Sequence, residues 1–190
     1  LEDPVEVIIN GVNQMMVNSK EGVSFANGLR SIMRQDPDVI MVGEVRDEET
    51  AVMAVRAALT GHKVYTTIHS TEPREVYLRL EEMGIKSYLI RESLVGILSQ
   101  RLIKMLCDSC KEEEIITYRG SRTKIYKRGI GCEKCNFTGY LGRALIISIN
   151  EITKDVKKKL VKIYDDNTIL TNIQMVDNLN NLLLNGKISR

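Results

Sequence analysis

The chain has 190 residues, of which 43% are hydrophobic and 27% charged, and its formal net charge is +2. This composition is ordinary for a soluble protein, and the length allows one domain or a domain with a small appendage. No run approaches the roughly 18 apolar residues that span a bilayer, and the N-terminus lacks a secretory signal, so we expect a cytoplasmic protein. Basic and acidic side chains number 12 and 15 over residues 1–106 but 8 and 5 over 107–143, an excess too small to predict nucleic-acid binding.

The first part of the chain predicts alternating helices and strands. It begins at "LEDPVEVIIN" without Met, which predicts a fragment of a longer protein. Ser24 as N-cap and apolar residues at helical spacing predict a helix over 24–35. Pro37 disfavours helix at Asp36, and the continuous apolar run 39–42 predicts a strand buried on both faces.

The next elements continue this alternation. In chain order we expect a helix from the cap Asp47 to Gly61, a strand over 63–70, and a helix opened by Thr71 and Pro73 and ended by Gly84. This order predicts a parallel α/β sheet, which binds ligands at the carboxyl ends of its strands, here around Glu44 and His69.

The remainder of the chain is less regular. Apolar spacing predicts a further helix over 93–106, and the polar segment after Cys107 predicts a loop or hairpin. Amphipathic patterns predict helices over 155–164 and 175–186.

Glu44 follows the buried strand and is a candidate catalytic carboxylate. Hydrolysis of a phosphoanhydride needs a group near the phosphates that orients the attacking water and accepts its proton. Four apolar residues followed by an acid are a weak signal, because a strand end that points into solvent gives the same pattern.

His62 and His69, the two histidines of the chain, lie where the strand expected at 63–70 begins and where it ends. A histidine at the carboxyl end of a strand can donate an N–H bond to a terminal phosphate. The alternative is a structural histidine bonded to the backbone, and both alternatives stay open on this pattern.

The four cysteines form two CxxC pairs, Cys107 with Cys110 and Cys132 with Cys135. In a chain without an export signal such pairs predict a closed, structural tetrathiolate zinc site. A redox-active CxxC and two disulfides are the alternatives. Basic residues with interleaved tyrosines lie between the pairs, from Arg119 to Arg128, and predict a solvated hairpin or docking surface more than a nucleic-acid site.

Five segments carry a family resemblance: "EDPVE", "GLRSIMRQDPDVIMVGEVRDEETA", "AALTGHKVYTTIHS", "LSQRLIKMLCDSCK" and "GCEKCNFTGYLGR". In this order and approximate spacing the chain resembles, over residues 1 to about 151, the secretion ATPases that power type II secretion and type IV pilus assembly. Retraction motors resemble the core but generally lack the tetracysteine element, so the resemblance favours secretion, pilus assembly or DNA uptake.

The resemblance implies an α/β fold with part of a RecA-like P-loop NTPase core, in which a mostly parallel sheet is flanked by helices. It implies three parts: the C-terminal part of the ATPase core (1–106), a zinc-binding subdomain (107–143) and a C-terminal helical segment (144–190). It further implies ATP with Mg²⁺, Zn²⁺, and a homo-hexamer that is peripheral at the cytoplasmic membrane, acts on a membrane platform protein and does not insert into the bilayer.

Residue roles follow from the same resemblance. Glu2 belongs to the acidic box and is expected near the nucleotide or its attacking water, with Asp3 and Glu6 in support. Glu44 is the acid of an atypical second Walker motif in which Gly43 replaces the usual aspartate. His62 and His69 match the histidine box, with His69 as phosphate sensor, and the four cysteines match the zinc element.

The phosphate-binding pattern G-x-x-x-x-G-K-[ST] does not occur in the 190 residues. We therefore expect the chain to be inactive alone and the longer parent to hydrolyse ATP. The alternative function is a zinc-stabilised interaction or nucleic-acid-binding module without catalysis.

Overall fold

The computed structural model describes residues 1–118, 120–166 and 170–189, without the side chains of Ser19 and Tyr118. Arg119, the first residue of the expected basic stretch, therefore lies outside the described residues. The chain divides into two compact units: unit 1 comprises Leu1–Ile97 and Glu151–Leu170, and unit 2 comprises Leu98–Asn150 and Thr171–Arg190. These boundaries differ from the three parts that the resemblance implies.

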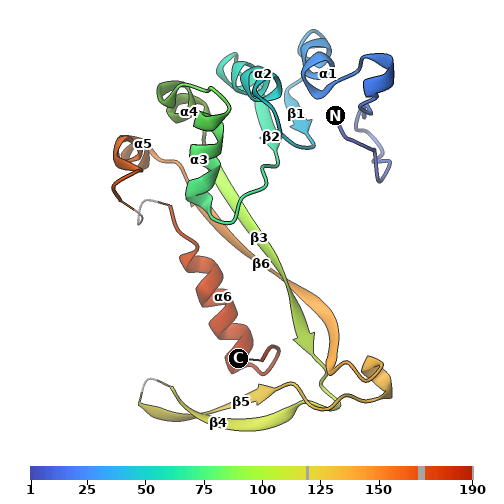
Figure 1. Ribbon diagram of the computed structural model, residues 1–190, viewed down its shortest axis with the longest axis vertical. Coiled ribbons are helices and arrows are strands. Elements are labelled where there is room, and N and C mark those ends of the chain that lie inside the picture. Colours follow the sequence, from blue (N-terminus) through green and yellow to red (C-terminus); the bar gives the residue numbers. More distant parts are fainter. Residues whose placement is uncertain (119, 167–169, 190) are drawn as a thin grey trace. The chain divides into compact units, whose positions relative to one another are not determined.

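Unit 1 is an α/β arrangement in which helices pack on a parallel strand pair (Figure 1). Its elements are the 3-10 helix Ser19–Glu21, α1 (Phe25–Ile32), β1 (Val39–Val42), α2 (Glu48–Leu59), β2 (Lys63–Thr66), α3 (Pro73–Glu82), α4 (Ser87–Ser93), α5 (Lys154–Lys159) and the 3-10 helix Leu160–Lys162. β1 and β2 run parallel, with Val39 opposite Lys63 and Val42 opposite Thr66. The predicted order of helices and strands up to Gly84 is confirmed.

The expectation that β1 is buried on both faces is wrong. Ile40 and Val42 are buried, whereas Val39 and Met41 are 55% and 46% exposed. A strand alternates its side chains between two faces, and within the described residues the helices cover only the face of Ile40 and Val42.

Capping explains where the first helices begin. The Ser24 side chain accepts a hydrogen bond from the Asn27 amide at the start of α1. Asp47 accepts from the Thr50 amide at 2.8 Å and from the Thr50 hydroxyl at 3.1 Å, at the start of α2. These bonds satisfy amides that have no partner inside the helix.

We expect Asp47→Ala to lower the free energy of unfolding of unit 1 by about 1 kcal/mol, because it removes the cap of α2. It also leaves the hydroxyl of Thr50, a residue that is 1% exposed, without its acceptor. Urea unfolding followed by circular dichroism measures the change. The control is Glu49→Ala in the same helical turn, where an exposed ion pair with Arg30 contributes little. Equal losses in the two variants would contradict the role of the cap.

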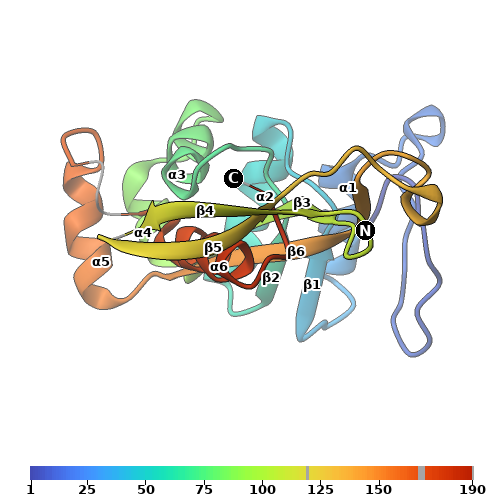
Figure 2. The same ribbon diagram turned by 90° about the horizontal axis from the view of Figure 1, so that it is seen from below.

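Unit 2 combines a long strand pair, a hairpin and a helix (Figure 2). Its elements are β3 (Gly96–Leu106, beginning in unit 1), β4 (Glu112–Tyr118), β5 (Ser121–Lys127), the 3-10 helix Glu133–Cys135, β6 (Tyr140–Glu151, ending in unit 1) and α6 (Ile173–Leu184). β4 and β5 form an antiparallel hairpin, as the polar segment after Cys107 predicts. α6 overlaps the predicted range 175–186 but begins and ends two residues earlier.

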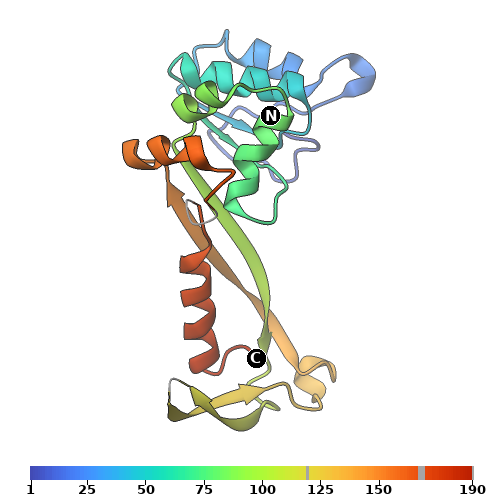
Figure 3. The same ribbon diagram turned by 60° about the vertical axis from the view of Figure 1, so that its left-hand side comes forward.

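The prediction of a helix over 93–106 is wrong, because most of this segment is strand β3. β3 pairs with β6 (Figure 3), and bonds from the Cys107 amide to the Gly139 carbonyl and from the Ile152 amide to the Val95 carbonyl make the pair antiparallel. β3 carries apolar side chains on both faces, so its sequence has no period-2 alternation, and its helical spacing is accidental. A partner strand distant in sequence decides the structure instead.

β6 also corrects the expectation of a purely helical tail from residue 144. The segment "LIISI" within it is rich in β-branched residues, which favour strands. The helical part begins with α5 at Lys154, one residue before the predicted start, and the α-helical turns end at Lys159.

Unit 2 has a small core. The large cluster of buried apolar side chains takes its members from unit 1. The described buried apolar residues of unit 2 are Leu106, Cys107, Ile125, Cys135, Ile146, Met175 and Ile188. Two of these seven are cysteines, so the cysteine cluster forms a substantial part of what holds this unit together.

Candidate functional site

Glu44 and His69 meet at the carboxyl ends of β1 and β2. The Glu44 side chain is 13% exposed, and its Oε2 atom lies 3.6 Å from Nε2 of His69, within ion-pair range but beyond an ordinary hydrogen bond. Two bonds join the segments that follow the strands: the Val45 amide donates to the Thr67 carbonyl at 3.0 Å, and the Thr67 hydroxyl donates to the Gly43 carbonyl at 2.6 Å. These bonds fix the backbone segments from which the Glu44 and His69 side chains project.

Arg46 is a site residue that the sequence interpretation missed. Its Nε lies 2.6 Å from Oε2 of Glu44, so the carboxylate is held between a guanidinium and an imidazole. The sequence signal that could have identified Arg46 is its spacing from Glu44, because residues two apart in an extended segment project to the same side. The Arg46 side chain is 68% exposed, so this pairing is accessible to solvent.

His62 does not join this group. Its Nδ1 lies 3.0 Å from the Ala57 carbonyl and 3.2 Å from the Thr60 hydroxyl, and its amide donates to Ala57 as well. These bonds secure the C-terminal end of α2, which is the structural alternative for this histidine. His69 is the histidine whose position suits contact with a ligand.

Leu1, the neighbour of Glu2 in the chain, contacts the site through its backbone, whereas the Glu2 carboxylate is bonded to Gln14. Oε2 of Glu2 accepts a hydrogen bond from the Gln14 side chain at 2.7 Å. The Gly43 amide donates to the Leu1 carbonyl at 2.8 Å, and a Cβ atom added at Gly43 would lie only 3.2 Å from that oxygen. The close approach explains why glycine precedes Glu44 and keeps the acidic box beside the end of β1.

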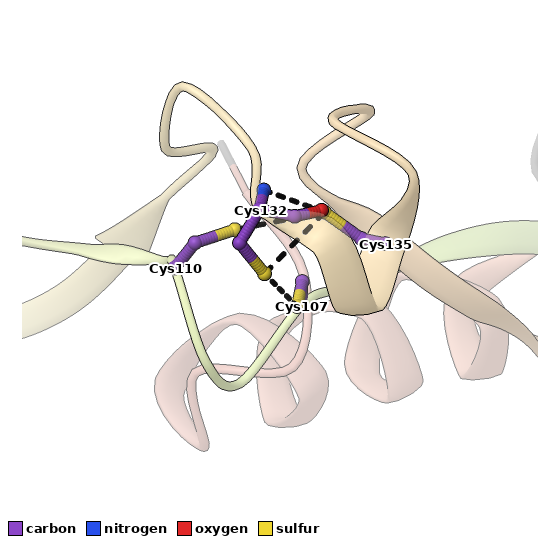
Figure 4. Close-up of side chains that lie close together, drawn as sticks. All are labelled: Cys107, Cys110, Cys132 and Cys135. Atoms are coloured by element: carbon purple, nitrogen blue, oxygen red, sulfur yellow. Dashed lines mark hydrogen bonds between the residues drawn. The ribbon is translucent and has the colours of Figure 1, made fainter.

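The four cysteines form one cluster (Figure 4). Their Sγ atoms all lie within 4.8 Å of one another, and the Cys107–Cys132, Cys110–Cys135 and Cys132–Cys135 distances are 3.8, 3.8 and 3.9 Å. Four sulfurs at about 2.3 Å from a central zinc ion form a tetrahedron with edges of about 3.8 Å. A disulfide requires about 2.05 Å between the sulfurs. The donor set and its spacing therefore fit a tetrathiolate metal centre.

Tight turns bring the sulfurs together. The Cys110 and Lys111 amides donate to the Cys107 carbonyl, and the Cys135 and Phe137 amides donate to the Cys132 carbonyl. Gly131 has φ +103°, and a Cβ atom there would lie 2.4 Å from the Phe137 carbonyl, so only glycine fits this turn.

The pKa values of two of the four thiols are shifted in opposite directions. Hydrogen bonds from the Cys132 and Gly139 amides lower the pKa of Cys135 to about 6. Burial and the neighbouring thiols raise the pKa of Cys110 to about 12. The backbone thus stabilises the Cys135 thiolate, whereas a bound cation would favour ionisation of Cys110.

Two of the four described basic residues in the stretch between the cysteine pairs are paired with carboxylates. Lys124 pairs with Glu113, and Lys127 lies 3.5 Å from Glu112, across the β4–β5 hairpin. A phosphate backbone would have to compete with these carboxylates. The described part of the hairpin therefore supports the solvated alternative.

Comparison with known proteins gives one family. A family model described as "Type II/IV secretion system protein" matches residues 1–187. The chain is 47% identical over 150 residues to type II secretion system protein E of Dickeya dadantii, which covers 75% of this chain and 30% of that protein. It is 43% identical over 172 residues to the type IV pilus assembly ATPase PilB of Thermus thermophilus, which covers 85% of this chain and 19% of that protein.

Solved structures agree on the fold. The pilus retraction motor PilT with bound ADP has a TM-score of 0.69 and is 26% identical, and the match covers 99% of this chain and 48% of that chain. The ATPase DotB of Legionella pneumophila has a TM-score of 0.64 at 20% identity, covering 99% of this chain and 47% of that chain. The chain thus spans less than half the length of these proteins. Among its described residues, no helix is long and apolar enough to cross a membrane.

Proposed function

Because this chain belongs to the type II/IV secretion system protein family, we propose that it is the C-terminal part of a hexameric ATPase motor for protein secretion or for type IV pilus or competence pseudopilus assembly. The observation that carries the proposal is the meeting of Glu44, Arg46 and His69 at the ends of two adjacent parallel strands. Open α/β sheets bind their ligands at this edge.

Each site residue has a role in the proposed reaction. Glu44 orients the attacking water and accepts its proton, and His69 donates an N–H bond to the terminal phosphate. Arg46 positions the Glu44 carboxylate. Glu2 and His62 act from further away, Glu2 beside the Leu1–Gly43 backbone bond and His62 through the end of α2.

Zinc has a structural role in this proposal. Cys107, Cys110, Cys132 and Cys135 hold it, and a site closed by four protein ligands has no position for substrate. ATP binds with Mg²⁺ in the complete motor. The division into 1–106, 107–143 and 144–190 stays a prediction about the longer protein. We place the motor in the cytoplasm, peripheral at the membrane, where it acts on a platform protein.

The direct test compares this chain with the longer protein that contains it. We expect the longer protein to hydrolyse ATP and this chain to show no ATP binding by calorimetry, because phosphate affinity depends chiefly on a phosphate-binding loop and its lysine. Reading the codons upstream of Leu1 checks the premise, since they should encode that loop. A longer protein that has the loop, forms hexamers and does not hydrolyse ATP would refute the ATPase assignment.

A further inference from the structure

The segment from α5 through the following 3-10 helix carries an unusual concentration of lysine. Five of its nine residues are Lys154, Lys157, Lys158, Lys159 and Lys162, against one acid, Asp155. All five lysines belong to unit 1, and none of them is part of the site formed by Glu44, Arg46 and His69. The proposed function assigns this segment no role.

Packing sorts the side chains of this segment onto two faces. Leu160 and Ile163 are 1% exposed and belong to the core of unit 1, and Val156 packs against that core. The Lys157 ammonium is bonded to the Glu92 carbonyl. The outward face therefore consists of Lys154, Asp155, Lys158, Lys159, Val161 and Lys162, all of them exposed. We call these six residues the lysine face.

Two contacts, made by the residues that directly follow Lys162, hold this segment in place. The Arg74 Nε donates to the Ile163 carbonyl at 2.9 Å, and the Tyr164 hydroxyl is bonded to Glu81 on α3. The segment is thus fixed by α3 and by the core, while the lysines stay free of the packing. The Lys158–Asp155 pair at 3.5 Å, with side chains 80% and 85% exposed, is a weak ion pair.

We propose that the lysine face binds the surface of an anionic phospholipid bilayer. Clusters of four or more basic residues on an amphipathic helix are attracted to anionic headgroups by about 1 kcal/mol per residue. The basic residues are all lysines, which act as hydrated point charges, whereas bidentate recognition of a defined phosphate or carboxylate relies on arginine. Val161, 67% exposed among the lysines, adds apolar surface that can enter the headgroup region.

This contact differs from the platform protein of the proposed function and does not require nucleotide. It is a surface contact, since within the described residues no helix can span a bilayer. Failure of the inference would leave the ATPase proposal intact, because the binding test uses the 190-residue chain alone.

The test is co-sedimentation of the chain with vesicles of phosphatidylglycerol and phosphatidylcholine in equal parts, against phosphatidylcholine alone. We expect binding to the mixed vesicles only, and a decrease as salt rises. Lys158→Gln with Lys162→Gln should weaken binding about 30-fold, and Asp155→Asn should strengthen it about fivefold. The matched control, Lys63→Gln with Lys86→Gln, removes the same charge from unit 1 outside the lysine face and should leave binding unchanged.

Three results would overturn the proposal. The first is equal binding to the two vesicle types. The second is equal weakening by the double variant and its control, which would show an effect of overall charge alone. The third is full competition by glycerol phosphate, or binding of poly-aspartate in place of vesicles, which would assign the lysine face to a small anion or an acidic protein. Circular dichroism confirms that each variant is folded.

Discussion

Replacing Cys107 with serine should abolish zinc binding and unfold the region around the four cysteines. Cys107 is fully buried, and its sulfur is one of four that lie within 4.8 Å of one another. Zinc contributes about 10–16 kcal/mol of apparent binding free energy in small zinc-finger peptides, and this energy is folding energy. Unit 2 has few other buried apolar side chains, so it has little with which to compensate.

Two measurements follow the effect. Metal analysis of the reduced, purified chain should give one zinc ion per chain, and close to none for Cys107→Ser. Hydrogen exchange should show lost protection over 107–111 and 131–139, while the amides of α2 in unit 1 keep theirs. A chelator that removes zinc should reproduce the same pattern in the unchanged chain.

Ser109→Ala is the matched control, because it changes an exposed side chain between two of the ligands and keeps all four thiols. It should retain full zinc content. Zinc well below one equivalent in the unchanged reduced chain would contradict the metal centre. A mass decrease that shows disulfides in fresh protein would favour the alternative of two disulfides.

The sequence predicted local elements well where the signals were local. Ser24 and Asp47 cap helices as expected, and the parallel pairing of β1 and β2 follows from the order of strand and helix. Two CxxC pairs in a chain without an export signal are typical of a metal site and therefore predicted a cysteine cluster. The geometry supports this cluster.

The errors lie where distant pairing decides the structure. β3 and β6 pair across more than thirty intervening residues, and neither shows a strict alternation, so β3 was predicted as helix and β6 was not predicted. The same limit applies to the site. The residue pattern alone left the roles of the two histidines open, and the family resemblance favoured His69. Packing shows His69 beside Glu44 and His62 at the end of α2, and only geometry reveals Arg46.

In the longer protein, Glu44→Gln should lower kcat for ATP hydrolysis by about 100-fold to 10,000-fold, the usual loss when a positioned base is removed. Glutamine keeps the shape and the ability to orient water, but it cannot accept the proton. Nucleotide affinity should change little, since the carboxylate is proposed to act on water and not on the phosphates. Steady-state hydrolysis and binding of a fluorescent ATP analogue measure the two quantities separately.

Glu49→Gln is the control for this variant. It neutralises a carboxylate five residues further on, whose side chain is 63% exposed and pairs with Arg30, and it should leave kcat unchanged. Comparable losses of kcat in the two variants would mean that charge or folding, and not proton transfer, limits the reaction. Normal turnover in Glu44→Gln would remove Glu44 from the mechanism.

Arg46 decides how the result for Glu44 is understood. Its ion pair with Glu44 holds the carboxylate near His69, yet a side chain that is 68% exposed gains at most about 1 kcal/mol from such a pair. Bound phosphates can therefore compete for the guanidinium at little cost. If Arg46 only positions Glu44, then Arg46→Ala should lower kcat when Glu44 is present. Added to Glu44→Gln, it should cause no further loss of kcat. Additive losses would instead show that Arg46 contacts the nucleotide itself, because residues that act through one group are not additive.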